Sequence, residues 1–215
     1  MAMSATAPDS NAPRRRGRPP RKPDDQAARK ALIRAGLAQL TESGYANVGL
    51  DEITAAAGVT KGSFYHYFPN KAAFGAELIE AYGAFFRDKI SRSLDRADLT
   101  PLARLQAFTR DAEAGMAKYD FRRGCLIGNL GQEMSRLPEE YRARLIAVLE
   151  RWQALVADCL RAGQATGEVP ATQDPEILAE IFWTGWEGAV LRTKLQRNPE
   201  PLRRFTDGFL RLARS

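Results

Sequence analysis

The sequence predicts an all-α protein with a three-helix head and a six-helix body. Apolar residues recur at helical spacing in one segment after another, and no stretch shows the alternation of β-branched residues that is typical of a strand. Glycine and proline lie between these segments, where helices end and begin. The expected divisions are a basic arm over residues 1–23, the head over residues 24–70 and the body over residues 71–215.

The head contains three predicted helices. The first, "DDQAARKALIRAGLAQLTESG", begins with two acidic residues, which favour the positive end of a helix dipole, and ends at Gly44. The next segment, "LDEITAAAG", predicts a short helix that its glycine ends, and Thr60 can cap another over residues 61–67. Two short helices joined by a tight turn that contains glycine are typical of a helix-turn-helix motif.

The body is helical in every segment. Pro69 closes the motif, and Asn70 can cap the long helix "KAAFGAELIEAYGAFFRDKISRSL". Beyond Pro101 follow "LARLQAFTRDAEAGMAKY", the short "GCLIGNLGQEMSR" and the long "EEYRARLIAVLERWQALVADCLRAG". The segments "DPEILAEIFWTGWEGAVLRTKLQR" and, past Pro199, "PLRRFTDGFLRLAR" complete the pattern.

The positive charge is concentrated in the arm. Residues 1–23 carry six basic groups and one acidic group, whereas the remaining residues hold 26 basic and 25 acidic groups. The net charge of +6 is therefore almost wholly a property of the arm. A basic arm on a nearly neutral body favours a polyanionic partner, with nucleic acid first and an acidic membrane second.

Within the arm, "RGRP" matches the core of the AT-hook, an extended element that lies in the minor groove of A·T-rich DNA. Prolines hold the chain extended, Gly17 lets the backbone descend, and Arg16 and Arg18 can reach the negative floor of the groove. A disordered tail that only aids solubility is the alternative. The position directly before a helix-turn-helix favours a second DNA contact.

Several classes of function are disfavoured. No run of about 18 apolar residues could span a membrane, and the N-terminus has no secretory pattern. Cys125 and Cys159 fit no disulfide or metal framework, which favours a cytoplasmic protein with reduced thiols and no metal or cofactor. The single histidine, His66, has no catalytic partners in sequence, and no phosphate-binding loop is present, so we expect no enzyme.

The stretch "GVTKGSFYHYFPNKAAF", with the first helix and the Gly44-Tyr45 corner, resembles the DNA-binding head of the TetR family of bacterial repressors. The resemblance is strong over residues 26–75 and extends further only in helix order. It implies a homodimer whose second domain binds a small inducer that spreads or twists the two heads. One departure is Gly49, where the family often has Ser or Thr, so a hydroxyl contact to phosphate is lost.

The N-terminal end of the second short helix is the candidate recognition end, because such helices enter the major groove by their first residues. Here these residues are Thr60, Lys61, Gly62 and Ser63. Lys61 can reach a guanine edge or a phosphate, Ser63 can donate or accept, and Gly62 lets the backbone approach closely. The sequence therefore predicts a DNA contact at these four residues.

The residues that follow this recognition end are expected either to contact DNA or to pack in the core of the head. The family pattern implies that four of them face the sugar-phosphate backbone: Tyr65, His66, Tyr67 and Lys71. The alternative is that the aromatic residues only pack, and for Phe64 and Phe68 packing in the head is the expectation.

"RRGCLIGNLGQE" contains the candidate sensing residue. Cys125 follows two arginines and begins a short helix, and both features are expected to lower the pKa of its thiol. The alternative is a small buried apolar residue, the usual role of a free cysteine. Cys159, in the middle of a long helix, is expected to be structural.

Together with "WEGAVLRTK", this stretch resembles the TetR repressors that respond to reactive electrophiles and to acrylate. The resemblance implies that Cys125 is the sensing thiol, that Asn129 lies on a helix beside the inducer pocket, and that Lys194 lies near the cysteine. The implied inducer is a small α,β-unsaturated compound, whose carboxylate Lys194 or an arginine would hold.

The penultimate helix mixes large aromatic with small residues: Phe182, Trp183, Gly185, Trp186, Gly188 and Ala189. Small residues allow close helix approach, and the resemblance to the family implies that the last two long helices pair with their symmetry mates. The glycine face is therefore assigned to dimerisation, and Trp186 is the candidate for a pocket wall. The sequence as a whole favours a dimeric repressor that binds a palindromic operator and is released by an inducer. The alternatives are a helical ligand-binding protein or enzyme with an incidental basic tail, and a nonspecific DNA-compacting protein.

Overall fold

The computed structural model describes residues 23–215, which form nine α-helices and one short 3₁₀ helix. The predicted all-α class, with a helix-turn-helix head and a helical body, is confirmed for these residues. Arg16 and Arg18, the predicted minor-groove contacts, lie outside the described residues. The elements are α1 Pro23–Ser43, α2 Leu50–Ala57, α3 Lys61–Tyr67, α4 Lys71–Leu94, α5 Pro101–Ala117, α6 Leu126–Gln132, η1 Met134–Arg136, α7 Glu140–Thr166, α8 Pro175–Gln196 and α9 Glu200–Leu212.

The helix starts in the head follow from capping residues. The Thr60 hydroxyl accepts a hydrogen bond from the Ser63 N–H at 3.1 Å and begins α3, as predicted. The Asn70 side chain accepts from the Ala73 N–H at 2.7 Å and begins α4, also as predicted. Gly49 has no side chain to cap α2, and its own N–H donates to the Glu52 carboxylate at 3.3 Å.

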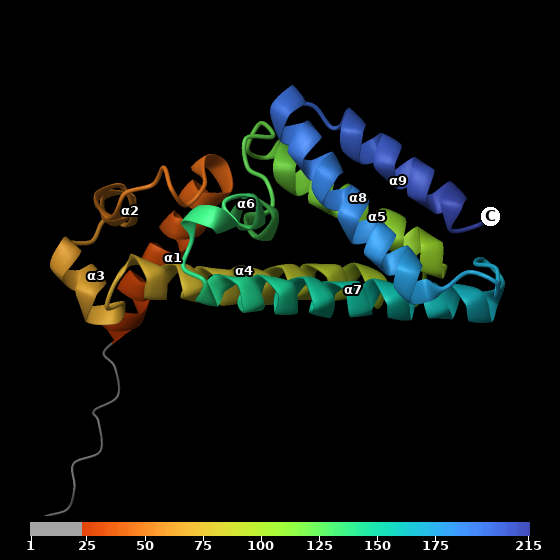
Figure 1. Ribbon diagram of the computed structural model, residues 1–215, viewed down its shortest axis with the longest axis horizontal. Coiled ribbons are helices and arrows are strands. Elements are labelled where there is room, and N and C mark those ends of the chain that lie inside the picture. Colours follow the sequence, from red (N-terminus) through yellow and green to blue (C-terminus); the bar gives the residue numbers. More distant parts are fainter. Residues whose placement is uncertain (1–22) are drawn as a thin grey trace, which may run out of the picture.

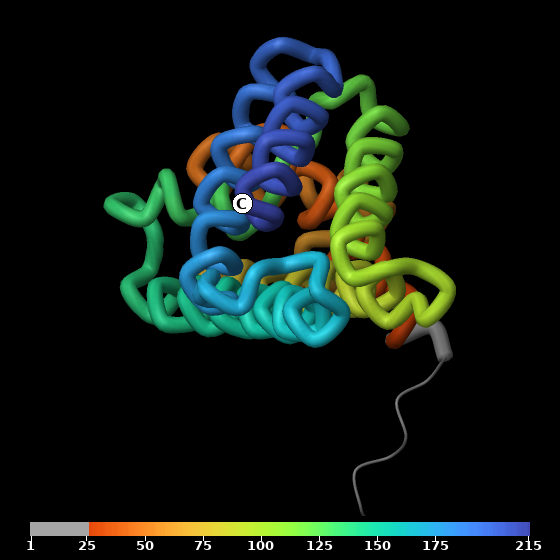
Figure 2. The backbone as a smooth tube through the Cα atoms, turned by 90° about the vertical axis from the view of Figure 1, so that its right-hand side faces the viewer, coloured from red at the N-terminus to blue at the C-terminus, as the bar shows by residue number. Residues whose placement is uncertain are grey.

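The helices form two groups, shown in Figure 1. Helices α1, α2 and α3 gather at one end of the molecule, where α1 packs against α2, α4 and α6. The long helices α4 and α7 run side by side, and α5, α8 and α9 lie obliquely over them. In Figure 2, which looks along the long axis, α5 forms one side and α8 with α9 the other. No helix within residues 23–215 is long and apolar enough to cross a membrane.

Aromatic side chains fill the core of both groups. In the head, Phe64 and Phe68 are buried against Phe74, with ring centroids 5.3 and 4.8 Å away, which confirms that they pack. In the body, Trp152 on α7 lies 5.2 Å from Trp183 on α8 and donates its indole N–H to the Gly83 carbonyl on α4 at 3.2 Å. Burial of these large side chains stabilises the α4, α7 and α8 packing.

Candidate DNA-binding surface and inducer site

The first turn of α3 is open to solvent. Thr60, Lys61 and Gly62 are exposed and Ser63 is half-buried. The Lys61 ammonium lies 2.8 Å from the Asp51 carboxylate on α2, and this hydrogen bond raises the pKa of Lys61. Because the pair is exposed, a phosphate can replace Asp51 at little cost.

Gly62 is not required by the packing of the head. A Cβ atom added there would meet only the Thr60 hydroxyl, at 3.8 Å. The backbone at this position therefore remains bare toward solvent, which suits close approach by an external partner.

The rest of α3 carries the predicted backbone-facing side chains. Tyr65 is 50% exposed, and its ring makes an edge contact with Phe64. His66 is exposed and Tyr67 half-buried, with their ring centroids 5.0 Å apart. The fold brings residues 60–67 together on one short surface helix, as the motif predicts.

Lys71 lies at the start of α4, where the family pattern expects a phosphate contact. Its ammonium donates to the Tyr45 carbonyl at 2.7 Å and lies 4.2 Å from the centroid of the Tyr45 ring. Partial burial lowers its pKa. Lys71 thus braces the corner between α1 and α2.

Cys125 lies at the N-cap of α6 and is only 4% exposed. Burial, together with the nearby Glu187 carboxyl, holds the pKa of its thiol well above the ordinary value. The expectation of a lowered pKa is therefore wrong. The two arginines before it do not act on the thiol, because Arg122 and Arg123 each lie 3.7 Å from the Glu42 carboxylate at the end of α1.

Two partly buried groups lie beside the thiol and influence it. The Glu187 carboxyl on α8 raises the pKa of Cys125, whereas the Tyr82 hydroxyl on α4 and the Gly128 backbone lower it. Burial raises the pKa of Tyr82 well above its ordinary value, so the hydroxyl remains a donor.

Glu187 is the unusual member of this set. Burial raises the pKa of its carboxyl to about 7, and the neighbouring Cys125 thiol opposes that rise. Its Oε1 atom is closed off from solvent and has no hydrogen-bond partner among the described residues. Its Oε2 atom packs against Gly128, where any larger residue would collide with it.

Aromatic rings surround this polar set. The Tyr82 ring stacks on Phe86 at 5.7 Å and lies 6.2 Å from Trp152, which in turn contacts Trp183. The indole N–H of Trp183 is buried without a partner among the described residues. Trp186, the predicted pocket wall, packs against Phe108, Phe182 and Phe205 and makes an edge contact with Trp183 at 6.2 Å.

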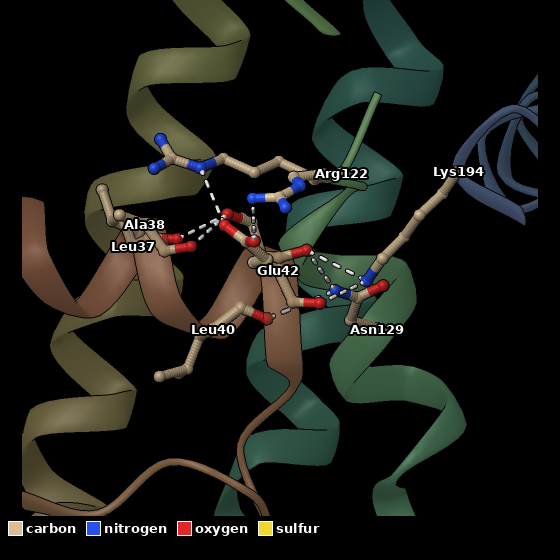
Figure 3. Close-up of polar contacts among 9 residues, drawn as sticks. Leu37, Ala38, Leu40, Glu42, Arg122, Asn129 and Lys194 are labelled. Atoms are coloured by element: carbon tan, nitrogen blue, oxygen red, sulfur yellow. Dashed lines mark hydrogen bonds and ion pairs between the residues drawn. The ribbon is translucent and has the colours of Figure 1, made fainter. Parts of the chain in front are cut away.

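The C-terminal end of α1 is held by residues of the body, as Figure 3 shows. The Asn129 side-chain amide donates to the Leu40 and Thr41 carbonyls at 3.3 and 3.1 Å. The Lys194 ammonium donates to the Thr41 and Glu42 carbonyls at 3.3 and 2.7 Å. Cations and donors suit the negative end of a helix dipole. Lys194 thus passes beside Gly124, next to the cysteine, but its ammonium is directed to α1.

Glu133, the residue that ends α6, holds the corner between α1 and α2. Its carboxylate accepts from the Tyr45 and Ala46 N–H groups at 3.1 and 2.9 Å. Gly44 allows this, since its φ of +82° favours glycine and a Cβ atom there would collide with the Glu133 carboxylate. The short α6 segment therefore contacts the thiol site at its start and the head at its end.

Sequence reasoning missed Tyr82, Glu133 and Glu187. Glu187 carried a usable signal, because it is an acid four residues after Trp183 and three before Val190, both apolar positions of one helical face. Tyr82 and Glu133 lie in ordinary amphipathic helices, and nothing in their spacing distinguishes them.

The second cysteine has ordinary surroundings. The Cys159 thiol is buried and donates to the Pro101 carbonyl at 3.2 Å, and burial raises its pKa to about 12. This contact joins α7 to the start of α5, in keeping with the predicted structural role of Cys159. Within residues 23–215 no group of three or more His, Cys, Asp or Glu residues could hold a metal ion.

The outer face of α8 carries an exposed apolar stripe. Its apolar side chains are Ile177, Ile181, Leu191 and Leu195, and the exposed Thr184 and Gly188 lie between them at the same spacing of three or four residues. Gly188 lies on this face, as assigned for dimerisation, but Gly185 does not. A Cβ atom at Gly185 would collide with Phe205, so this glycine serves the packing of α8 on α9 within the chain.

An exposed recognition helix on a helical body with a buried polar site defines a DNA-binding transcriptional regulator. The chain belongs to the tetR family of bacterial regulatory proteins. The model of that family's DNA-binding region matches residues 32–78, and the model described as the tetracyclin repressor-like C-terminal domain matches residues 101–209.

Individual relatives agree with the family. The chain is 56% identical over 209 residues to the transcriptional regulator AcuR of Cereibacter sphaeroides, covering 97% of this chain and 95% of that protein. It is 36% identical over 177 residues to the transcriptional repressor DhaR of Mycobacterium sp. strain GP1, covering 82% and 87%. The crystal structure of a TetR regulatory protein from Rhodobacter sphaeroides superposes with a TM-score of 0.85 at 58% identity, covering 86% and 97%. The chain is thus a TetR-family transcriptional repressor, a class that binds operator DNA through its helix-turn-helix head.

Proposed function

We propose that the protein is a homodimeric repressor of a palindromic operator, released by a small α,β-unsaturated compound, acrylate or a related electrophile, sensed at Cys125. It is a cytoplasmic regulator and not an enzyme. The observation that carries this proposal is the position of Cys125: the helix that it begins also holds the C-terminal end of α1 and the corner after it. An event at the thiol is therefore one short helix away from the DNA-binding head.

Release follows from the tight packing around the thiol. Cys125 is 4% exposed at the start of α6, with Tyr82 of α4 and Glu187 of α8 beside it, so a ligand that packs on or adds to the sulfur must displace α6. Displacement of α6 weakens the hydrogen bonds of Asn129 and Glu133 to α1 and its corner. Because α1 packs directly against α2 and α3, the recognition helix moves with it.

The inducer thereby favours a head spacing that no longer fits the operator. Recognition helices of a dimer must enter major grooves about one helical turn apart, roughly 34–36 Å. The inducer can shift the population only by the difference between its affinities for the two states.

The homodimer is supported by the apolar stripe of α8, which a single chain leaves exposed. Pairing of this stripe with its symmetry mate buries it and sets the distance between the two heads. Sedimentation of the wild-type protein checks this, and a monomer at micromolar concentration would contradict it.

The first test is gel shift with DNA from the region upstream of the protein's own gene, with and without small unsaturated acids, esters and aldehydes. We expect specific binding that such compounds release. Binding that is indifferent to sequence at every salt concentration would instead support a DNA-compacting protein. Absence of binding, with a ligand still bound, would support a ligand-binding protein or enzyme.

The sensing role is tested by Cys125→Ser, with Cys159→Ser as the matched control. Cys125→Ser is expected to bind the operator like the wild type but to need far more inducer for release, since a hydroxyl is a much poorer nucleophile than a thiol. Cys159→Ser is expected to respond normally. An unaltered inducer response in Cys125→Ser would contradict the proposed sensing role of Cys125.

A further inference from the structure

The two helices of the helix-turn-helix motif carry little positive charge of their own. Residues 44–70, which span α2, the turn and α3, contain one lysine, Lys61, and two acids, Asp51 and Glu52, so their formal net charge is −1 with the histidine counted as neutral. The arm, by contrast, carries six basic groups and one acidic group. Since lysine and arginine drive the binding of DNA of any sequence, the motif is poor in the charge that nonspecific binding needs.

Asp51 holds the lysine of this surface. Its carboxylate, in the first turn of α2, lies 2.8 Å from the Lys61 ammonium in the first turn of α3. The Asp51 side chain is 80% exposed and the Lys61 side chain is 52% exposed, so the pair lies on the surface of the head and not in its core. An exposed pair of this kind contributes little to the free energy of folding. The fold therefore does not require an acid at this position.

The N-terminal end of α2 is occupied by the second acid. The Glu52 carboxylate accepts a hydrogen bond from the Gly49 N–H at 3.3 Å, and the Gln39 side-chain amide donates to the Glu52 carbonyl at 3.1 Å. The N–H groups and the dipole at the start of a helix otherwise favour a phosphate. Because two carboxylates already lie in the first turn of α2, a phosphate is disfavoured there.

We propose that Asp51 is a specificity-determining residue: by holding Lys61, it cancels the charge of that lysine toward DNA phosphates, so that the first turn of α3 adds affinity at the operator and little elsewhere. This inference rests on the proposed contact of the first turn of α3 with DNA. It goes beyond that contact because it assigns the discrimination between operator and other DNA to an acid of α2.

Discrimination follows from what Lys61 gains when it leaves Asp51. On DNA of arbitrary sequence the ammonium exchanges a carboxylate for a phosphate, one anion for another, and the freed carboxylate then faces the negative backbone. That exchange gains little. At the operator the ammonium can instead donate to a guanine edge, a contact that depends on the base. Specificity is the difference between the two binding free energies, so a charge that lowers the affinity for other DNA increases it.

Asp51→Asn tests the proposal, because it removes the charge and keeps the shape of the side chain. The full-length proteins are titrated by fluorescence anisotropy with two duplexes: the upstream fragment that the wild type binds in the gel shift, and a shuffled sequence of the same length and composition. We expect the affinity of the variant for the shuffled duplex to rise about fivefold, with a salt slope steeper by about 0.9 per protomer. The affinity for the operator should stay within about twofold, so the ratio of the two affinities falls.

Three further variants separate the role of the pair from a general effect of charge. Asp111→Asn is the matched control, because Asp111 forms the same kind of pair with Lys89, at 2.9 Å, in the body; it should leave both affinities unchanged. Asp51→Glu keeps the charge and should keep the wild-type ratio. In a Lys61→Ala background, Asp51→Asn should lose most of its gain on the shuffled duplex, since no ammonium remains to be freed.

Three outcomes would overturn the proposal. One is an Asp51→Asn protein with the wild-type ratio of operator affinity to shuffled-duplex affinity. Another is a ratio that falls only because operator affinity falls, since Asp51 would then read a base itself, as a carboxylate can at cytosine. The third is an equal gain in the Lys61→Ala background, which would mean that Asp51 acts on DNA directly. If Lys61→Ala alone lowers operator affinity while any of these results holds, the DNA contact of α3 stands and only the role of Asp51 fails.

Discussion

The first turn of α3 and the Cys125 site each place their key polar group beside a carboxyl group, yet the two pairs differ in burial. Lys61 forms an ion pair with Asp51 that is open to solvent. Cys125 is buried between α4, α6 and α8, beside Glu187. An exposed pair exchanges partners at little cost because water replaces what is lost, whereas a buried pair can be broken only by a ligand that compensates for it. The α3 surface can therefore meet DNA without rearrangement, while the Cys125 site cannot admit a ligand without moving the protein.

The two regions are joined by α6. Its first residues contact the thiol site, and Asn129 and Glu133 hold the end of α1 and the corner after it. Figure 1 places α6 between the head and the rest of the body. The comparison thus implies that changes at the surface should alter DNA affinity alone, and changes at the junction should alter the response to inducer.

The largest effect on operator affinity is expected from changes in the exposed residues of α3. Lys61→Ala combined with Tyr65→Ala should lower operator affinity on the order of a hundredfold, because we expect each side chain to contribute a base or backbone contact. Alkylation of Cys125 should be unchanged, since neither residue contacts the body site. Gel-shift titration and mass mapping measure the two quantities. Lys118→Ala, which changes an exposed lysine of the body, is the control. If the operator affinity of the double variant lies within about twofold of that of this control, then the first turn of α3 is not the DNA-binding surface.

A smaller effect is expected from the arm. Deletion of residues 1–22 removes six of the basic groups and should lower operator affinity about tenfold at moderate salt. The dependence of the binding constant on salt should flatten as well, because fewer counterions are released. Dimerisation and inducer binding should persist. If the shortened protein has the same binding constant and the same salt dependence as the full chain, then the arm is better interpreted as a solubilising tail.

The smallest effect is expected at the junction. Lys194→Met removes the ammonium from the Thr41 and Glu42 carbonyls while keeping most of the side-chain length. The ratio of operator affinities without and with inducer should shrink severalfold, a loss of about 1 kcal/mol in coupling. The rate of alkylation at Cys125 should stay the same. Lys118→Met is the matched control. If Lys194→Met gives the same ratio of operator affinities as this control, then the contact of Lys194 with α1 does not transmit the effect of the inducer.

Much of the fold could be predicted because its signals are local. Thr60 and Asn70 cap helices through hydrogen bonds to residues three positions away, so the starts of α3 and α4 were predicted correctly. Gly44 has a positive φ, which a sequence can indicate. The Glu133 carboxylate that also requires glycine there comes from a distant part of the chain and gave no signal.

The chemistry of the thiol could not be predicted because it depends on side-chain direction. Neighbouring arginines in sequence suggested a lowered pKa, but Arg122 and Arg123 turn toward Glu42. The groups that do surround the thiol, Tyr82 and Glu187, arrive from α4 and α8. Burial and the Glu187 carboxyl raise the pKa of the thiol, and the Tyr82 hydroxyl opposes that rise only in part.

The sequence by itself determined the helices, the helix-turn-helix head and its exposed recognition end, because periodicity, caps and turn residues act within a few positions. Only the tertiary structure decided which groups meet Cys125, where Asn129 and Lys194 direct their donors, and that one helix joins thiol and head. Those contacts join segments far apart in the chain, and whether a charge there is solvated or buried is set by packing alone.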